Sequence, residues 1–190
     1  MHIQITNGWL TETATISRCP SPNADQRPCD TAVSLLVIHH ISLPPHEFGG
    51  DAIEAFFTNH LDTQKHPFYQ EIADLRVSAH VLIKRNGAMV QFVNFNERAW
   101  HAGKSDYHGR TNCNDFSIGI ELEGDEIAAY RYAQYKVLTA LTRALQVQYP
   151  EIQQHITGHE HIAPGRKTDP GPTFDWARYQ QSLHDPENPC

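Results

Sequence analysis

The sequence predicts a single α/β domain, residues 1–190, in which helices flank a central mixed β-sheet. Strand and helix patterns mingle along the chain without the regular strand–helix–strand rhythm of a nucleotide-binding sheet. One pair of strands carries an Asn-Gly turn and must therefore be antiparallel. The composition, 39% hydrophobic and 19% charged, is that of an ordinary globular protein, and 190 residues suffice for one well-buried core.

The first predicted strand is the apolar run "SLLVIHHI", residues 34–41, which is rich in branched side chains. Such a run is typical of a strand that is covered on both faces, and the prolines of "SLPP" end it. The following segment "DAIEAFFTNHL" predicts a short helix. Asp51 can cap its N-terminus, and Ile53, Phe56 and Phe57 share one side of it.

Two further strands, residues 77–84 and 88–95, are predicted to form a hairpin around Asn86-Gly87, the strongest short signal for such a turn. His80 lies in the first of them and is expected to be a hydrogen-bonded core histidine. The stretch "FSIGIELEG", residues 116–124, alternates in part and ends with two carboxylates. It predicts a strand that delivers acidic groups to the edge of the sheet.

The longest helix is predicted from about residue 132 to residue 149, where apolar residues recur along one face and Pro150 ends the pattern. The sequence locates the first residue of this helix only to within several positions, because Arg131 is not a capping residue. A last short helix is expected over residues 175–183. Residues 184–190 are expected to form a flexible tail.

Charge and composition exclude several classes of partner. The net charge of −7 argues against nucleic acid or an anionic membrane as the main partner. No tract is long and apolar enough to cross a bilayer, and the start of the chain does not look like a signal peptide, so the expected compartment is the cytoplasm. We also expect a monomer. The four cysteines, Cys19, Cys29, Cys113 and Cys190, show no metal or disulfide spacing and are expected to be reduced thiols.

Thirteen histidines are an unusually large number for this length, and histidine is the commonest metal ligand. The segment "GHEHIAPGRKTDPG", residues 158–171, places two of them on a stretch that prolines and glycines constrain, so little of it is expected to be helix or central strand. A catalytic zinc site needs three His or carboxylate ligands and one open position. The candidate ligands are His39 or His40 at the end of the first strand, His159 or its competitor His161, and Asp169.

Two more residues would complete a hydrolytic site. Glu121, with Glu123 as its rival on the same face of the strand, could take a proton from an attacking water molecule. Lys167 could hold its ammonium against the oxyanion that forms when water attacks a carbonyl.

Six motifs follow one another along the chain: "GWL", "SLLVIHHISLPPHEFGG", "LRVSAHVLI", "RAWHAG", "CNDFSIGIELEG" and "GHEHIAPGRKTDPGPTFDW". Together they resemble the zinc-dependent N-acetylmuramoyl-L-alanine amidases, in particular the cytoplasmic AmpD type that cleaves anhydromuropeptides in cell-wall recycling. The resemblance covers nearly the whole chain. It implies a zinc ion on His39, His159 and Asp169, with Glu121 as the catalytic carboxylate and Lys167 as the catalytic lysine.

The resemblance also implies substrate contacts and shows two departures. Arg76 would grip a carboxylate of the muropeptide stem, and Trp100 would pack on the sugar ring. His40, which we also expect to contact the substrate, stands where the family commonly has Asn. Asn112 stands where some relatives have Arg, and Arg110 is the residue that could substitute for it.

Two other functions compete with a recycling amidase. Related recognition proteins share the implied fold and bind peptidoglycan without cutting it, usually after the loss of a zinc ligand, whereas this chain keeps all three. An amidase that acts on intact peptidoglycan is the second alternative, and the missing signal peptide argues against it.

Overall fold

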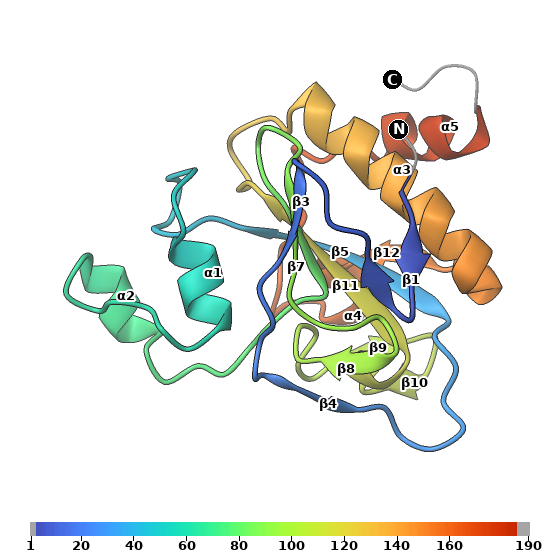
Figure 1. Ribbon diagram of the computed structural model, residues 1–190, viewed down its shortest axis with the longest axis horizontal. Helices are drawn as coiled ribbons and strands as arrows, with labels where there is room; N and C mark the ends of the chain where they lie inside the picture. The colour runs from blue at the N-terminus through green and yellow to red at the C-terminus, as the bar shows by residue number, and fades with distance from the viewer. Residues whose placement is uncertain (1–2, 186–190) are drawn as a thin grey trace.

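A six-stranded sheet forms the centre of the computed structural model, which describes residues 3–185 (Figure 1). The strand order is β12 (Ile156–Gly158), β5 (Leu35–Ile41), β11 (Ser117–Glu123), β6 (Val81–Ile83), β7 (Met89–Gln91) and β3 (Ile16–Arg18). The first four strands run parallel, β7 is antiparallel to β6, and β3 is parallel to β7. The predicted mixed sheet and its antiparallel hairpin are therefore confirmed.

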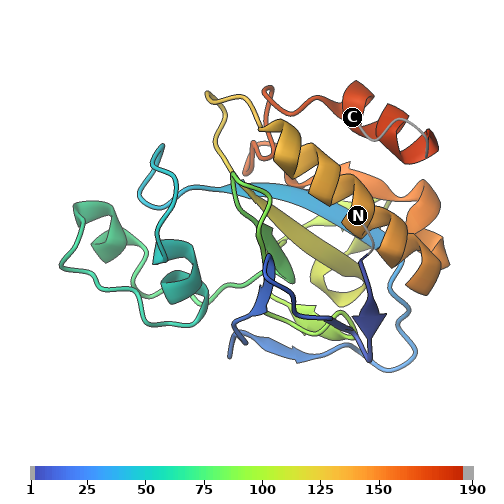
Figure 2. The same ribbon diagram turned by 45° about the horizontal axis from the view of Figure 1, so that its top comes forward.

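Each face of the sheet has its own core. On one face, helices α3 (Tyr132–Gln148) and α5 (Trp176–His184) lie together above the strands (Figure 2). The apolar cluster there joins Leu138 and Leu141 of α3 to the even-numbered residues Ile38 and Ile120 of the central strands. On the opposite face, the odd-numbered residues Leu35 and Val37 of β5 pack with Ala102, Cys113, Phe116 and Ile162.

This alternation places functional residues side by side. Successive side chains of a strand point to opposite faces, so His39 continues the face of Leu35 and Val37. The parallel register pairs His39 with Glu121 on β11. Both side chains consequently project from neighbouring strands on the face that α3 leaves open.

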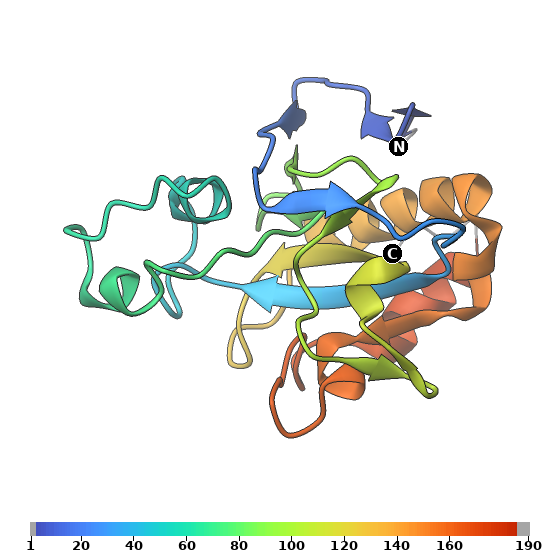
Figure 3. The ribbon, with the colours of Figure 1, turned by 90° about the horizontal axis from the view of Figure 1, so that it is seen from below.

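Helices α1 (Ala52–Phe57) and α2 (Pro67–Glu71) form an arm beyond the C-terminal end of β5 (Figures 1 and 3). Ile53, Phe56 and Phe57 are buried, as the sequence predicts, in a core cluster that joins this arm to strands β6 and β7. The predicted cap is wrong, because the side chain of Asp51 makes no capping hydrogen bond to α1. Helix α2 was not predicted.

The other predictions agree with the structure except at boundaries. Strands β6 and β7 are shorter than the predicted hairpin strands, and His80 lies just before β6. Helix α3 begins at Tyr132, where the side chain of Gln134 accepts a hydrogen bond from the Arg131 backbone in place of a capping residue. His184 ends α5, and the rest of the predicted tail lies outside the described residues except for Asp185.

The remaining elements are short and were not predicted. They are β1 (Ile5–Thr6), β2 (Trp9–Leu10), β4 (Ala24–Gln26), β8 (Glu97–Ala99), β9 (Asp106–Tyr107), β10 (Arg110–Thr111), η1 (Cys113–Asp115), η2 (Pro150–Gln154) and α4 (His159–Ile162). None of the helices within residues 3–185 has the length and apolar character that crossing a membrane requires.

Candidate metal centre and active site

The segment from Gly158 to Gly171 brings two candidate ligands together. Contrary to the prediction, its first residues are helical, because His159 opens the one-turn helix α4 directly after β12. The segment then folds back, and the Glu160 backbone N–H donates a 2.8 Å hydrogen bond to the carbonyl of Asp169. Gly158 permits this close return, because a Cβ there would lie only 2.7 Å from the Cδ of Pro170.

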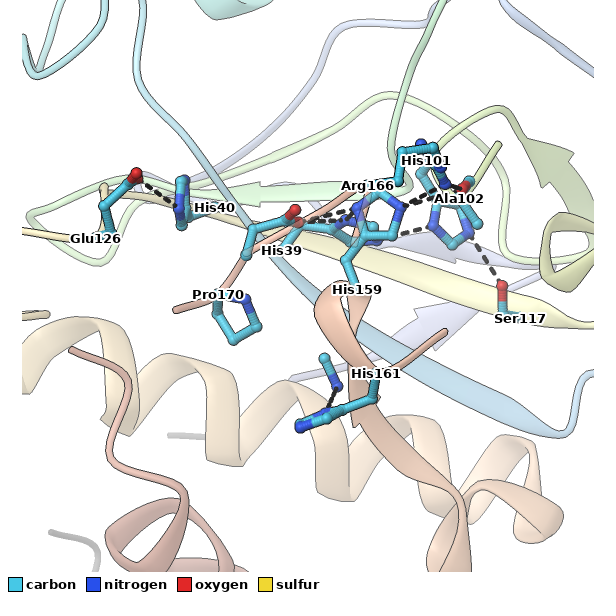
Figure 4. A network of polar contacts seen from close by, with 12 residues as sticks. His39, His40, His101, Ala102, Ser117, Glu126, His159, His161, Arg166 and Pro170 are labelled. Carbon is cyan, nitrogen blue, oxygen red and sulfur yellow. Dashed lines mark hydrogen bonds and ion pairs between the residues drawn. The ribbon is translucent and has the colours of Figure 1, made fainter. Parts of the chain in front are cut away.

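Three buried side chains converge at the end of β5, and two of them, His39 and His159, are labelled in Figure 4. His39 Nδ1, His159 Nδ1 and Asp169 Oδ2 lie 3.0 Å from one another in all three pairings. The two alternative histidines lie outside this cluster. His40 Nε2 is 3.4 Å from a carboxylate oxygen of Glu126, and His161 points back toward the backbone N–H of Gly158.

The donor set of this cluster fits a zinc ion. His159 Nε2 lies 3.0 Å from the carbonyl oxygen of Ala102, which can only accept, so Nε2 carries a hydrogen and Nδ1 is the ring nitrogen that faces the cluster. Ligand atoms around a tetrahedral zinc lie about 3.3 Å apart when each is about 2.0 Å from the metal. Two imidazole nitrogens and one carboxylate oxygen at 3.0 Å match that spacing and leave a fourth position open.

Burial sets the protonation of the cluster. It lowers the pKa of His39 to about 4, outweighing the neighbouring Asp169, which acts in the opposite direction. Burial would raise the pKa of Asp169, but its contacts with His159 and His39 outweigh burial and hold that pKa well below the usual range. Near neutral pH the cluster therefore offers a neutral His39 ring and a carboxylate, the states in which these residues bind metals.

Glu121 is the carboxylate available for chemistry. Burial raises its pKa well above the ordinary value, the charge of Asp169 adds to this rise, and Lys167 opposes it. Its Oε2 atom is buried without a hydrogen-bond partner among residues 3–185. Its rival Glu123 is fully engaged, because its two oxygens accept hydrogen bonds from the backbone N–H groups of Gly49 and Arg85.

The cluster opens into a cavity of about 430 Å³. Its polar end is lined by His39, His40, Glu121, His159, Lys167 and Asp169. Its apolar wall comes from the arm and the segments beside it, and includes Phe56, Phe68, Ile72 and Leu75. The cavity can therefore hold a molecule with both polar and apolar parts next to the three converging ligand atoms.

Three of the predicted substrate contacts do not line this cavity. Arg76 donates to the carbonyls of its own loop, at Ala73 and Leu75. Arg110 lies 3.7 Å over the ring of Phe116, and the backbone of Trp100 bonds to Ser78. Asn112, the second departure from the family, has a left-handed backbone at the start of η1.

His101 is a residue of the cavity that the sequence did not single out. Its Nδ1 lies 2.9 Å from His39 Nε2, and burial lowers its pKa well below the ordinary value, with His39 as the next cause. Its place in "RAWHAG" was visible in the sequence, but nothing in the spacing connected it with His39, 62 residues away.

Comparison with known proteins gives a consistent result. The sequence matches the family N-acetylmuramoyl-L-alanine amidase over residues 29–172. It is 60% identical to the 1,6-anhydro-N-acetylmuramyl-L-alanine amidase AmpD of Escherichia coli K12 over 173 residues, 91% of this chain and 93% of that protein. A crystal structure of a selenomethionine AmpD derivative aligns with a TM-score of 0.90 and 57% identity, over 94% of this chain and 98% of that one.

A more distant solved structure contains a ligand. The E. coli amidase AmiD, solved in complex with the substrate anhydro-N-acetylmuramic acid-L-Ala-D-gamma-Glu-L-Lys, is 27% identical to this chain. The TM-score is 0.57, and the alignment covers 94% of this chain and 65% of that one.

Proposed function

Because the chain belongs to the N-acetylmuramoyl-L-alanine amidase family, we propose that it hydrolyses the amide between anhydro-N-acetylmuramic acid and L-alanine in muropeptides, with zinc as its cofactor. The names of the relatives support the reaction and the substrate class. The observation that carries the proposal is the meeting of three ligand atoms beside a buried carboxylate that has no partner within residues 3–185. Cell-wall recycling is the role that this substrate implies, and the cytoplasm and a monomer stay predictions.

His39, His159 and Asp169 would hold the ion. When bound, a zinc ion supplies Lewis acidity, which polarises a carbonyl and lowers the pKa of a water molecule toward about 7. The ring nitrogen of His159 that faces away from the cluster is held by the Ala102 carbonyl, so this ligand needs no reorientation to bind.

Glu121 would move the proton. It projects beside His39 from the neighbouring strand, and burial raises its pKa well above the ordinary value, which favours a carboxyl that both takes and returns a proton. It would accept a proton from the attacking water and deliver it to the departing amine of L-alanine. Lys167, which lines the same cavity, would place its ammonium against the developing oxyanion.

The cavity suits a molecule of this class. A muropeptide has a sugar ring with apolar C–H faces and a stem with several carboxylates, and the cavity has an apolar wall on the arm and a polar end at the cluster. Of the predicted substrate contacts, His40 lines the cavity. Arg76, Trp100 and Arg110 stay predictions for parts of the substrate that extend beyond it.

The test compares three substrates in parallel: an anhydromuropeptide, a muropeptide with a reducing-end sugar, and intact sacculi. We expect release of peptide from the anhydromuropeptide, loss of release after chelation, and recovery when zinc is added back. Equally fast release from sacculi would favour an amidase of the intact wall. No release from any substrate by zinc-loaded protein would favour a peptidoglycan-binding module.

A further inference from the structure

Two consecutive residues, His101 and Ala102, contact the outer ring nitrogens of both histidines in the cluster (Figure 4). His101 Nδ1 lies 2.9 Å from His39 Nε2, and the Ala102 carbonyl lies 3.0 Å from His159 Nε2. We propose that this dipeptide is a positioning device that fixes the orientation and the tautomer of both histidine ligands. The inference rests on the zinc site of the proposed function.

The direction of each hydrogen bond in this series can be assigned by starting at the contact that lies farthest from the metal cluster. The Ser117 hydroxyl lies 2.5 Å from the carbonyl oxygen of Cys113, which only accepts, so the hydroxyl donates its proton there. The Ser117 oxygen is then free to accept from His101 Nε2, 3.0 Å away. A neutral His101 ring with its hydrogen on Nε2 presents Nδ1 to His39 as an acceptor.

This assignment determines which ring nitrogen of His39 carries the hydrogen, and so whether the nitrogen that faces the cluster can bind a metal. Because His101 Nδ1 accepts, His39 must donate from Nε2, and Nδ1 of its neutral ring is left with a bare lone pair directed at His159 and Asp169. The opposite tautomer would place a hydrogen on that atom and block coordination. A single backbone carbonyl, that of Cys113, thus selects the tautomer of His39 through two side chains.

Strand β11 is shaped to hold this arrangement. Ser117, Gly119 and Glu121 are alternate residues of β11 and share the face that His39 occupies on β5. A Cβ at Gly119 would lie 2.5 Å from the His101 ring, so the imidazole rests directly on the glycine backbone. One strand face therefore carries the bond to His101, the space for its ring, and the proposed base.

The backbone of the dipeptide is itself clamped. The side-chain oxygen of Asn114 accepts hydrogen bonds from both backbone N–H groups, at 3.1 Å from His101 and 2.7 Å from Ala102. Both contacts to the ligands are consequently set by the same rigid segment. We expect the two histidine ligands to keep their orientation in the metal-free protein.

The first experiment compares two substitutions of buried histidines, His101→Phe and His80→Phe. His80 also lies against Gly119, but its ring nitrogens contact the Gly119 N–H, the Glu97 carbonyl and the Arg27 guanidinium, and within residues 3–185 no hydrogen bond joins them to either histidine ligand. Zinc dissociation constants are measured by competition with a chelator, together with the thermal unfolding of each metal-free variant. His101→Phe should weaken zinc binding about 10- to 100-fold, as loss of an outer-shell partner typically does. His80→Phe should lower only the unfolding temperature.

A third variant tests rescue. In His101→Asn the amide oxygen takes the place of Nδ1 and can still accept from His39, so its zinc affinity should lie closer to wild type than that of His101→Phe. Equal zinc affinity of His101→Phe, His80→Phe and wild type would overturn the inference and leave the proposed amidase intact. Wild-type protein that binds no zinc would overturn both.

A measurement on the wild type decides the matter even where a variant does not fold. Nitrogen-15 NMR of the zinc-loaded protein reports which ring nitrogen of each histidine carries a hydrogen. We expect hydrogens on Nε2 of His39, His101 and His159. A hydrogen on Nδ1 of His101 would reverse the chain of hydrogen bonds and overturn the inference, whether or not the protein is an active amidase.

Discussion

The role of a buried residue in this protein depends on its hydrogen-bond partners more than on its residue type. Glu121 and Glu123 are both buried, both acidic, and two residues apart on one strand. Backbone N–H groups engage both oxygens of Glu123, whereas one oxygen of Glu121 lies without a partner within residues 3–185. Since unpartnered buried polar groups are costly, this difference supports Glu121 as the proposed base, while Glu123 holds two loops in place.

Replacing each carboxylate in turn separates these roles. Glu121→Gln should retain zinc and lose about 100- to 10,000-fold in kcat, the usual contribution of a positioned proton acceptor. Turnover by the purified variant on an anhydromuropeptide and its zinc content are the two measurements. Wild-type turnover in Glu121→Gln would exclude it as the base.

The matched control is Glu123→Gln. An amide has one acceptor oxygen where the carboxylate has two, so one of the N–H groups of Gly49 and Arg85 loses its partner. The variant should lose about 1–3 kcal/mol of unfolding free energy and keep its turnover per folded molecule.

At the level of elements, hydrogen bonds at helix ends separate two aspartates that look alike in the sequence. Asp51 and Asp175 each occupy the position before a short helix. The side chain of Asp175 accepts from the Arg178 N–H at the start of α5, whereas that of Asp51 makes no such bond at α1. The Asp175 backbone is also tied to α3, because its N–H donates to the Tyr135 hydroxyl.

The two positions therefore predict different stability losses. Asp175→Ala should lower the unfolding free energy by about 1 kcal/mol, within the range for loss of an N-terminal cap. Asp51→Ala should cost distinctly less. Urea unfolding of the metal-free variants measures both, and equal losses would show that the Asp175 hydrogen bond does not stabilise α5.

The molecule as a whole buries several histidines as neutral rings, and this couples its stability to pH. Burial, with the charge of Arg27 as the next cause, lowers the pKa of His80 to about 3 from an ordinary value of 6.5. Below about pH 6.5 the unfolded chain takes up a proton at this residue that the folded protein refuses. The contribution of His80 to stability is therefore complete above that pH and is lost as the pH falls toward 3.

We expect the unfolding free energy of the metal-free protein to fall between about pH 7 and about pH 5, with His80 contributing at most about 1.4 kcal/mol per pH unit. The His80→Asn variant, whose amide oxygen can still accept from the Gly119 N–H, should lose stability less steeply with acid. Urea titrations across this range compare the two proteins. Parallel curves would mean that His80 takes up its proton equally in the folded and unfolded states.

Much of the architecture was determined by the sequence alone. Strands β5 and β11 and helices α3 and α5 were predicted within a residue or two, because each is long enough for its apolar period to dominate over local effects. Shorter elements such as α2 and β8 escaped prediction, because they depend on contacts with distant residues more than on their own pattern. The family motifs likewise supplied His39, His159, Asp169, Glu121 and Lys167 as a set.

Only the tertiary structure decided how these residues meet. The register of β11 on β5 brings Glu121 beside His39, and the hydrogen bond between Glu160 and Asp169 returns the loop to the cluster. Sequence patterns could not predict the contacts of His101, because its ring bonds to His39 and Ser117 on two separate strands. The periodicity of a sequence indicates which face of a strand a side chain occupies. Which residue it contacts on the neighbouring strand depends on how the strands pair in the folded protein.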